Sequence, residues 1–141
     1  MKKIGFLFIT FMLLSVSLSF VSAQTDDKLD LALQQPKLRE IPAYVFNMTN
    51  LRELDLEGNR IGVIPRDILK LRNLEVLTLS GNLYLTALPD FLMDMESLKT
   101  IYFEGMRTWS QAKKDAAVRK FAQRGIKVIL SQQYHGVTDQ E

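Results

Sequence analysis

Two neighbouring carboxylates, Glu53 and Asp55, are the side chains best placed for acid–base chemistry, because alternation along a strand would put them on one face. Nothing in the surrounding sequence predicts burial, a pocket or a metal for this pair. The chain has no Cys and one His, His135, so it lacks a thiol nucleophile, a Cys-ligated zinc site and a His-rich metal site. We therefore predict no catalytic, cofactor-binding or metal-binding residue, and we expect the protein not to be an enzyme.

A repeat of 23 or 24 residues positions these carboxylates. The pattern Leu-x-x-Leu-x-Leu-x-x-Asn is complete in the copies that begin at Leu51 and Leu74. The copy that begins at Leu98 keeps the apolar positions but has Met106 in place of the Asn. Prolines and glycines recur at the same intervals, namely Pro42, Pro65 and Pro89, and Gly58, Gly81 and Gly105.

Each recurring residue has a structural reason. The leucines of a short strand alternate inward and fill a core that only neighbouring copies can complete. The Asn side chain binds backbone groups inside the bend that follows the strand, and the Pro sets the backbone angle of the return path. The predicted structural residues are Leu54, Leu56, Leu77 and Leu79 on the strands, Asn59 and Asn82 in the bends, and Pro65 and Pro89 on the return path.

The pattern resembles the 23-residue class of leucine-rich repeats found in bacterial and Ras-suppressor-like proteins. The resemblance implies an α/β repeat fold: a short solenoid with a curved parallel sheet of about four to five strands and a C-terminal capping helix and strand. It also implies that the concave face binds a partner. We assign residues 24–106 to the repeats, with a degenerate first copy near 28–50, then 51–73, 74–97 and 98–106, and residues 107–130 to the cap.

The first copy is the least regular. Counting back 23 residues from the second copy places Leu31 and Leu33 in the positions of Leu54 and Leu56. The same count places Pro36 in the position of the Asn.

Strand alternation also predicts which side chains point outward on the concave face. The N-terminal half of this face is acidic, and the second half is uncharged as far as Glu104. It would suit a protein or glycan with a basic edge and an apolar or sugar-like middle; the alternative is that these are ordinary solvated strand residues. The predicted partner-binding residues are Asp30, Glu53, Asp55, Glu57, Val76, Thr78, Thr100, Tyr102 and Glu104, with Ala32, Gln34 and Ser80 beside them.

After Met106 the periodicity changes and predicts a cap. Ser110 is the predicted N-cap of a helix that runs to Arg124, with Gly125 after its C-terminus and a closing strand over 126–130. We expect Trp109 to pack between the last repeat and this helix; exposed, it would be an interaction anchor. The predicted apolar stripe of the helix consists of Ala112, Ala116, Ala117, Phe121 and Ala122.

The rest of the cap helix is basic, and this suggests a second function. Its cations could hold the protein on anionic envelope polymers or lipid headgroups, with the repeats serving as a spacer. The alternative is a solvated helix face. The residues concerned are Lys113, Lys114, Arg119, Lys120 and Arg124.

Residues 1–23 have the pattern of a secretory signal peptide: Lys2 and Lys3, an apolar run, and small residues before a cleavage site after Ala23. An uncleaved membrane anchor is the alternative. We expect export to the periplasm, cell surface or medium, and no lipid anchor, because there is no Cys to acylate. The formal charge of +2 comes from Lys2 and Lys3, so the remainder is neutral and a nucleic-acid partner is not expected. We expect a monomer, with self-association through the stack ends as the alternative, and a flexible tail at 131–141.

Overall fold

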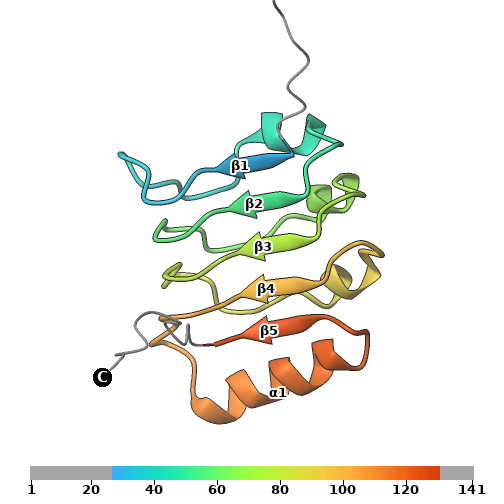
Figure 1. The fold of residues 1–141 in the computed structure, drawn as a ribbon. Helices are drawn as coiled ribbons and strands as arrows, with labels where there is room; N and C mark the ends of the chain where they lie inside the picture. The colour runs from blue at the N-terminus through green and yellow to red at the C-terminus, as the bar shows by residue number, and fades with distance from the viewer. Residues whose placement is uncertain (1–26, 131–141) are drawn as a thin grey trace, which may run out of the picture.

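The computed structural model describes residues 27–130, so the predicted signal peptide and C-terminal tail lie outside the described residues. A single parallel sheet forms one side of the molecule, with its strands in chain order from β1 to β5 (Figure 1). The prediction of a short solenoid with a parallel sheet and a C-terminal helix and strand is confirmed. The strands are β1 (Lys28–Asp30), β2 (Glu53–Asp55), β3 (Val76–Thr78), β4 (Thr100–Tyr102) and β5 (Lys127–Ile129).

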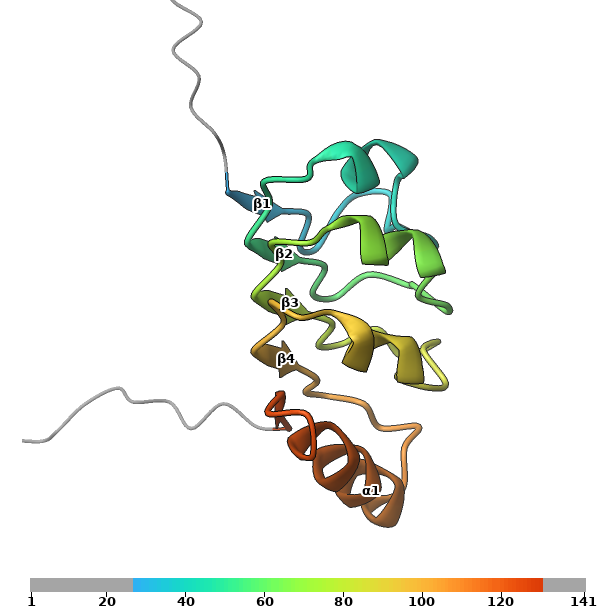
Figure 2. The ribbon, with the colours of Figure 1, turned by 90° about the vertical axis from the view of Figure 1, so that its right-hand side faces the viewer.

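Short 3₁₀ helices form the opposite side (Figure 2). Each follows a proline in the N-cap position, where the backbone is still extended and the residue that lacks an N–H leaves no donor unpaired. The 3₁₀ helices are η1 (Ala43–Asn47) after Pro42, η2 (Arg66–Lys70) after Pro65 and η3 (Asp90–Asp94) after Pro89. In the last copy, helix α1 (Gln111–Ala122) occupies the corresponding place before β5. No helix in residues 27–130 is long and apolar enough to span a membrane.

The core lies between these two sides and is built from the repeat positions. The central residue of each of the strands β2, β3 and β4 is buried, while its two neighbours point outward and are partly exposed. Leu54, Leu56, Leu77 and Leu79 are all at most 1% exposed. Because the copies bury one another's apolar faces, the stack depends on contacts between neighbouring copies.

Two buried asparagines link consecutive copies. The Asn59 side chain accepts a hydrogen bond from the Leu38 amide (3.0 Å) and donates to the Leu31 carbonyl (2.7 Å). The Asn82 side chain accepts from the Ile61 amide (3.0 Å) and donates to the Leu56 carbonyl (2.9 Å). Each Asn thus satisfies backbone groups of the copy before its own, which would otherwise be buried without partners.

The predicted register of the first copy is wrong by two residues. Leu29, rather than Leu31, lies opposite Leu54 in the sheet. Leu33 is 63% exposed and has a φ of 51°, so it does not take the core position of Leu56. The reason is the length of the loop between the two backbone groups that the Asn59 side chain binds, those of Leu31 and Leu38. This loop is two residues longer than the equivalent loop of the second copy, and it contains Pro36.

The C-terminal cap begins as predicted, because the Ser110 hydroxyl accepts a hydrogen bond from the Lys113 amide (3.3 Å). The helix ends at Ala122, two residues before the predicted Arg124. The predicted apolar stripe is partly wrong: Phe121 is buried and Ala117 is partly buried, but the other three alanines are exposed. Val118 packs against the core instead, because 117, 118 and 121 lie on one face of a 3.6-residue helix.

Trp109 joins the cap to the last repeats. Its side chain is 6% exposed, and its indole N–H donates to the Leu85 carbonyl (2.9 Å). Its ring meets the Phe103 ring edge to face at a centroid distance of 4.7 Å. Trp109 therefore packs at the junction and is not an exposed anchor.

Candidate partner-binding face

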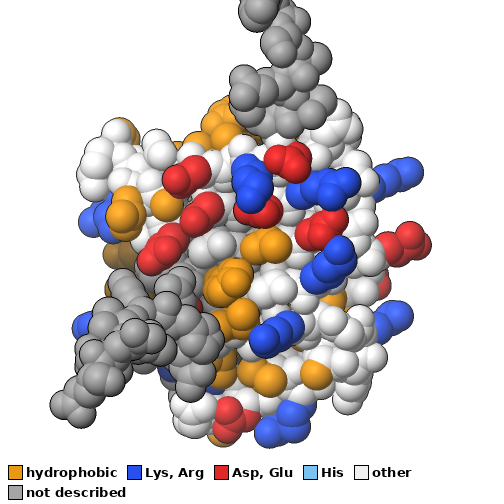
Figure 3. Space-filling view, viewed as in Figure 1, with side chains coloured by type: hydrophobic (Ala, Val, Ile, Leu, Met, Phe, Trp, Pro, Cys, Tyr) orange, Lys and Arg blue, Asp and Glu red, His pale blue; other side chains and the backbone are white. Residues whose placement is uncertain are grey.

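The outward-pointing residues of the five strands form a surface that we call the strand face (Figure 3). The parallel register aligns them in rows that run across the sheet. One row lies at the amino ends of the strands, a second lies at their carboxyl ends, and a third lies just beyond the carboxyl ends. The rows are Lys28, Glu53, Val76, Thr100 and Lys127; Asp30, Asp55, Thr78, Tyr102 and Ile129; and Ala32, Glu57, Ser80 and Glu104.

The amino ends of the strands carry an ion-paired belt. Lys28 and Glu53 form a salt bridge of 2.8 Å. Just before β3, Glu75 pairs with Lys99 at 2.6 Å and with Arg52 at 3.5 Å. The hydrogen bond from Lys99 lowers the pKa of the Glu75 carboxyl. Since Glu53 already has a cation beside it, it is a weaker candidate for a partner's basic group than the carboxylates nearer the carboxyl ends.

The middle of the strand face is uncharged. Val76 lies beside Thr100, and Thr78 lies beside Tyr102, which in turn adjoins Ile129. Figure 3 shows hydrophobic side chains running down this part of the surface. Apolar and aromatic side chains with few charges are typical of the centre of a protein interface.

The carboxyl ends of β1 and β2 carry three carboxylates, Asp30, Asp55 and Glu57, which we call the acidic corner (Figure 3, upper left). Asp30 accepts a hydrogen bond from the Ala32 amide (2.8 Å), and Asp55 accepts one from the Glu57 amide (2.9 Å). Within residues 27–130 no Lys or Arg forms a salt bridge with any of the three. The acidic corner therefore has negative charge available for a partner.

The ionised form of the Asp55 carboxyl is destabilised in the folded protein. Burial raises the pKa of its carboxyl, and the nearby Asp30 charge raises it further, against the opposing effect of the Glu57 amide. Both effects disfavour the ionised form. Asp30 lies opposite Asp55 in the sheet, not opposite Glu53 as the predicted register implied, and this accounts for the close approach of the two carboxylates.

Glu104 lies at the other end of the third row. Its amide donates to the Ser80 hydroxyl (3.0 Å), which ties β4 to the buried Ser80 of the preceding copy. One oxygen of its carboxylate is buried and has no hydrogen-bond partner in the described part of the chain. Ser80 lies between Glu104 and Glu57 in the third row, so Glu104 is not part of the acidic corner.

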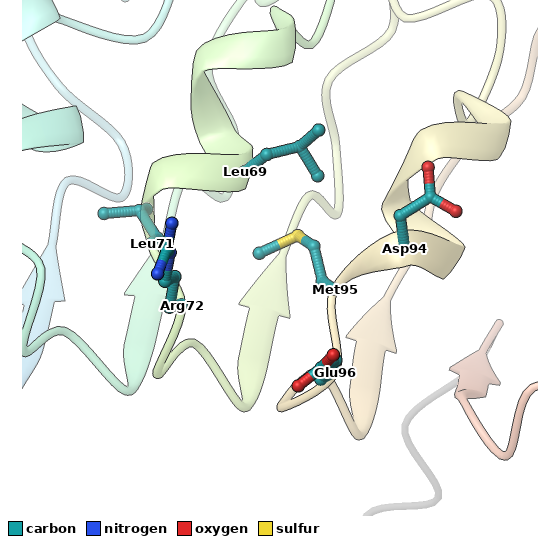
Figure 4. Close-up of a pocket in the computed structure, with 6 residues that line it drawn as sticks. All are labelled: Leu69, Leu71, Arg72, Asp94, Met95 and Glu96. Carbon is teal, nitrogen blue, oxygen red and sulfur yellow. The ribbon is translucent and has the colours of Figure 1, made fainter.

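The described residues show no cluster of His, Cys, Asp and Glu that could hold a metal ion. A hollow of about 260 Å³ lies on the opposite side, between η2 and η3. Figure 4 shows Leu69 and Met95 extending into it, while Asp94 and Glu96 lie apart from one another. No pair of polar side chains converges there for acid–base or ligand chemistry, so the strand face remains the better candidate.

The basic side chains of α1 are partly engaged within the fold. The Lys113 ammonium lies 4.2 Å from the centre of the Trp109 ring and donates to the Thr86 carbonyl. Lys120 forms a salt bridge of 2.6 Å with Asp90. Arg119 and Arg124 are exposed. Fewer cations than the sequence suggested are therefore available for an anionic surface.

Comparison with known families finds the leucine rich repeat twice, over residues 30–84 and over residues 49–105. Together these matches cover more than half of the chain. The chain belongs to the leucine-rich repeat family. Domains of this family commonly mediate protein binding and are generally not catalytic. No curated protein matches the chain.

Sequence reasoning missed three members of the leucine-rich repeat strand face, Lys28, Lys127 and Ile129. Lys28 was missed because the two-residue register error moved it off the face, whereas its pairing with Glu53 places it there. The predicted Gln34 falls beyond the third row for the same reason. Lys127 and Ile129 could have been predicted from the alternation of the closing strand, in which Val128 points inward.

We expect Asp55→Asn to stabilise the protein near neutral pH by about 0.5 kcal/mol, the size of an exposed charge interaction. Folding raises the pKa of this carboxyl above its unfolded value of 3.8. The protonated carboxyl therefore adds to the stability of the fold below pH 3.8, and this contribution is lost as the pH rises. The amide of Asn removes the charge and keeps an oxygen for the Glu57 amide. Urea unfolding of both proteins should show this gain at neutral pH and little difference below pH 3.8.

The matched control for this prediction is Glu57→Gln. It removes one charge from the acidic corner, but its side chain is exposed and makes no hydrogen bond to the described residues. Its effect on the urea midpoint should be smaller. An Asp55→Asn protein that is less stable than the parent at neutral pH contradicts the prediction.

Proposed function

We propose that this protein is an exported, non-enzymatic binding module whose strand face takes a protein partner. The partner presents Lys or Arg to the acidic corner and an apolar segment to the middle of the face, around Val76 and Tyr102. Export is part of the proposal and is supported by the sequence of residues 1–23.

The observation that carries the proposal is the uneven distribution of ion pairs across the strand face. Carboxylates at the amino ends form salt bridges with cations, whereas Asp30, Asp55 and Glu57 form none with the residues that the structure describes. Burial raises the pKa of Asp55, and the nearby Asp30 carboxylate raises it further, so its ionised form disfavours the folded state. A partner's cation would remove that cost on binding and would add charge complementarity.

Attachment to an anionic surface through α1, with the repeats as a spacer, is less well supported. Lys113 and Lys120 already have partners within the fold. On the strand face, by contrast, no Lys or Arg of residues 27–130 forms a salt bridge with the acidic corner, and the middle is uncharged.

Affinity capture with the whole protein as bait tests the proposal. A partner that binds the strand face should be retained by the parent protein and lost from the triple variant Asp30→Asn, Asp55→Asn, Glu57→Gln. Tyr102→Ala should also weaken retention, because it removes the aromatic side chain from the middle of the face. Added salt should weaken capture, since exposed charges contribute to it.

A matched control removes three carboxylates from outside the strand face: Glu40→Gln, Asp94→Asn and Glu96→Gln, all exposed. It changes the net charge equally, so capture by this control should equal that of the parent. Equal capture by the strand-face triple variant and the parent refutes the proposed binding face. Binding of the parent to anionic vesicles, lost on Arg119→Gln and Arg124→Gln, would favour attachment through α1 instead.

A further inference from the structure

One extra residue in the third copy alters the surface beside the carboxyl ends of the strands. One residue separates Asn59 from the next core residue, Ile61, whereas two residues separate Asn82 from Leu85. The longer bend carries Leu83 and Tyr84 outward, where they are 46% and 62% exposed. The extra residue therefore presents an aromatic ring on the surface at a place where the second copy has Arg60.

Tyr84 forms one wall of a hollow of about 310 Å³ that lies off the strand face. Its other walls are Arg39, Arg60 and Gly62. These residues come from three consecutive copies. The volume lies at the lower end of the range of small-molecule sites, about 300–1,000 Å³, and matches a compact ligand rather than an extended chain.

Gly62 leaves this hollow open. Its φ lies outside the left-handed region, so its backbone does not require a glycine. A Cβ added at this position would lie 3.7 Å from the Tyr84 carbonyl oxygen and 3.9 Å from the Tyr84 Cβ, and both distances are ordinary contacts. Close packing therefore does not explain why this residue is a glycine. Because glycine has no side chain, the space between Tyr84 and the two arginines stays open.

The arginines give the hollow its charge. Arg39 and Arg60 are exposed, and within residues 27–130 neither forms a salt bridge. Lys37 does not line the hollow; its ammonium donates to the Gly58 carbonyl (2.6 Å). Glu40 lines the adjoining hollow and is not among the residues that line this one. Guanidinium groups bind carboxylates with paired, charge-assisted hydrogen bonds.

The backbone that carries these side chains is fixed by the asparagine links. Leu38, next to Arg39, donates to Asn59, and the Arg60 amide donates to the Leu38 carbonyl (2.8 Å). Ile61 donates to Asn82, whose carbonyl in turn accepts from the Leu85 amide (2.9 Å). Binding at the hollow would therefore order side chains but not the main chain, which reduces its entropic cost.

We propose that this hollow binds an acidic sugar. The sugar's carboxylate lies between Arg39 and Arg60, and its ring packs on Tyr84 over Gly62. A bare anion would use the arginines alone and would leave the tyrosine face without a role. The site is separate from the strand face, so it does not rest on the function proposed above.

Titration of the ¹⁵N-labelled protein with glucuronate, followed by NMR, tests the proposal. We expect saturable shifts of the Arg39, Arg60, Gly62 and Tyr84 amides with a Kd on the order of 1 mM, as suits one sugar unit. Glucose, which lacks the carboxylate, should leave these amides unchanged. Arg60→Gln should weaken glucuronate binding about tenfold or more, the effect of one lost charge-assisted hydrogen bond.

Two further variants separate a site from general charge attraction. Gly62→Leu fills the hollow and keeps every cation, so it should abolish the shifts while the remaining spectrum shows an intact fold. Arg119→Gln removes the same charge from an exposed position on α1 and should bind like the parent.

Several results would overturn the proposal. They are the absence of shifts at these amides, equal shifts with inorganic phosphate or with an acidic peptide, and unchanged binding in Gly62→Leu. Loss of binding in Arg119→Gln would likewise show that overall charge, and not the hollow, attracts the sugar.

Discussion

Asn82→Ala should destabilise the protein by about 3 kcal/mol or more. The Asn82 side chain is fully buried and binds the Ile61 amide together with the Leu56 and Leu79 carbonyls, at 2.9–3.0 Å. Alanine leaves these backbone groups without partners in the core, and each buried unsatisfied group costs about 1–3 kcal/mol. Domains of this size are stable by only about 5–15 kcal/mol, so a large part of the total would be lost. Urea unfolding followed by circular dichroism measures the difference.

Asn73→Ala is the matched control for the asparagine link. Asn73 also reaches the preceding copy, where its side chain donates to the Thr49 carbonyl (2.9 Å), but the bond is exposed. Water replaces an exposed hydrogen bond, so we expect a change of about 0.5 kcal/mol or less. Equal destabilisation by the two variants would show that burial of the Asn82 bonds is not what makes them important.

Trp109→Ala should destabilise the protein by about 3–5 kcal/mol, as large-to-small substitutions of buried aromatic residues do. The change removes the contact with Phe103 and leaves a cavity where the cap meets the last repeat. It also removes the indole donor from the buried Leu85 carbonyl. Unfolding by heat or urea, followed by circular dichroism because the variant lacks the only Trp, measures the loss.

Trp109→Phe separates the two contributions. It keeps an aromatic ring in the junction but removes the N–H group, so it should cost less than the alanine variant. Hydrogen exchange locates the effect: amides of α1 and β5 should lose protection before those of β2 and β3. Equal loss of protection throughout the sheet would contradict a role confined to the cap junction.

The central copies could be predicted from the sequence because their core positions repeat without interruption. Leu54 and Leu77 occupy equivalent places, and the bends between copies have an Asn whose chemistry suits a buried turn. The family, the parallel sheet and the order of its elements followed from this pattern. The acidic corner was also visible, because its members alternate with leucines that point inward.

The first copy could not be predicted in the same way. Its strand has apolar residues at 29, 31 and 33, so alternation alone allows two registers that differ by two residues. The choice depends on where the Asn59 side chain finds its partners, which is a contact between distant parts of the chain. The inward face of α1 was missed for a related reason: alanines are compatible with either burial or exposure, so the orientation of the helix is set by Phe121 and Val118.

The hollow beside Tyr84 is lined by residues of three consecutive copies, and this limits how the protein can change its length. Solenoids grow by insertion of whole copies, and a further copy between the second and third would lengthen the strand face by one strand spacing, about 4.8 Å. The asparagine links could be remade at both new junctions. The same insertion would carry Tyr84 one level away from Arg60 and Gly62 and divide the hollow. The strand face can therefore be extended without loss of its pattern, whereas the hollow requires these three copies to remain adjacent.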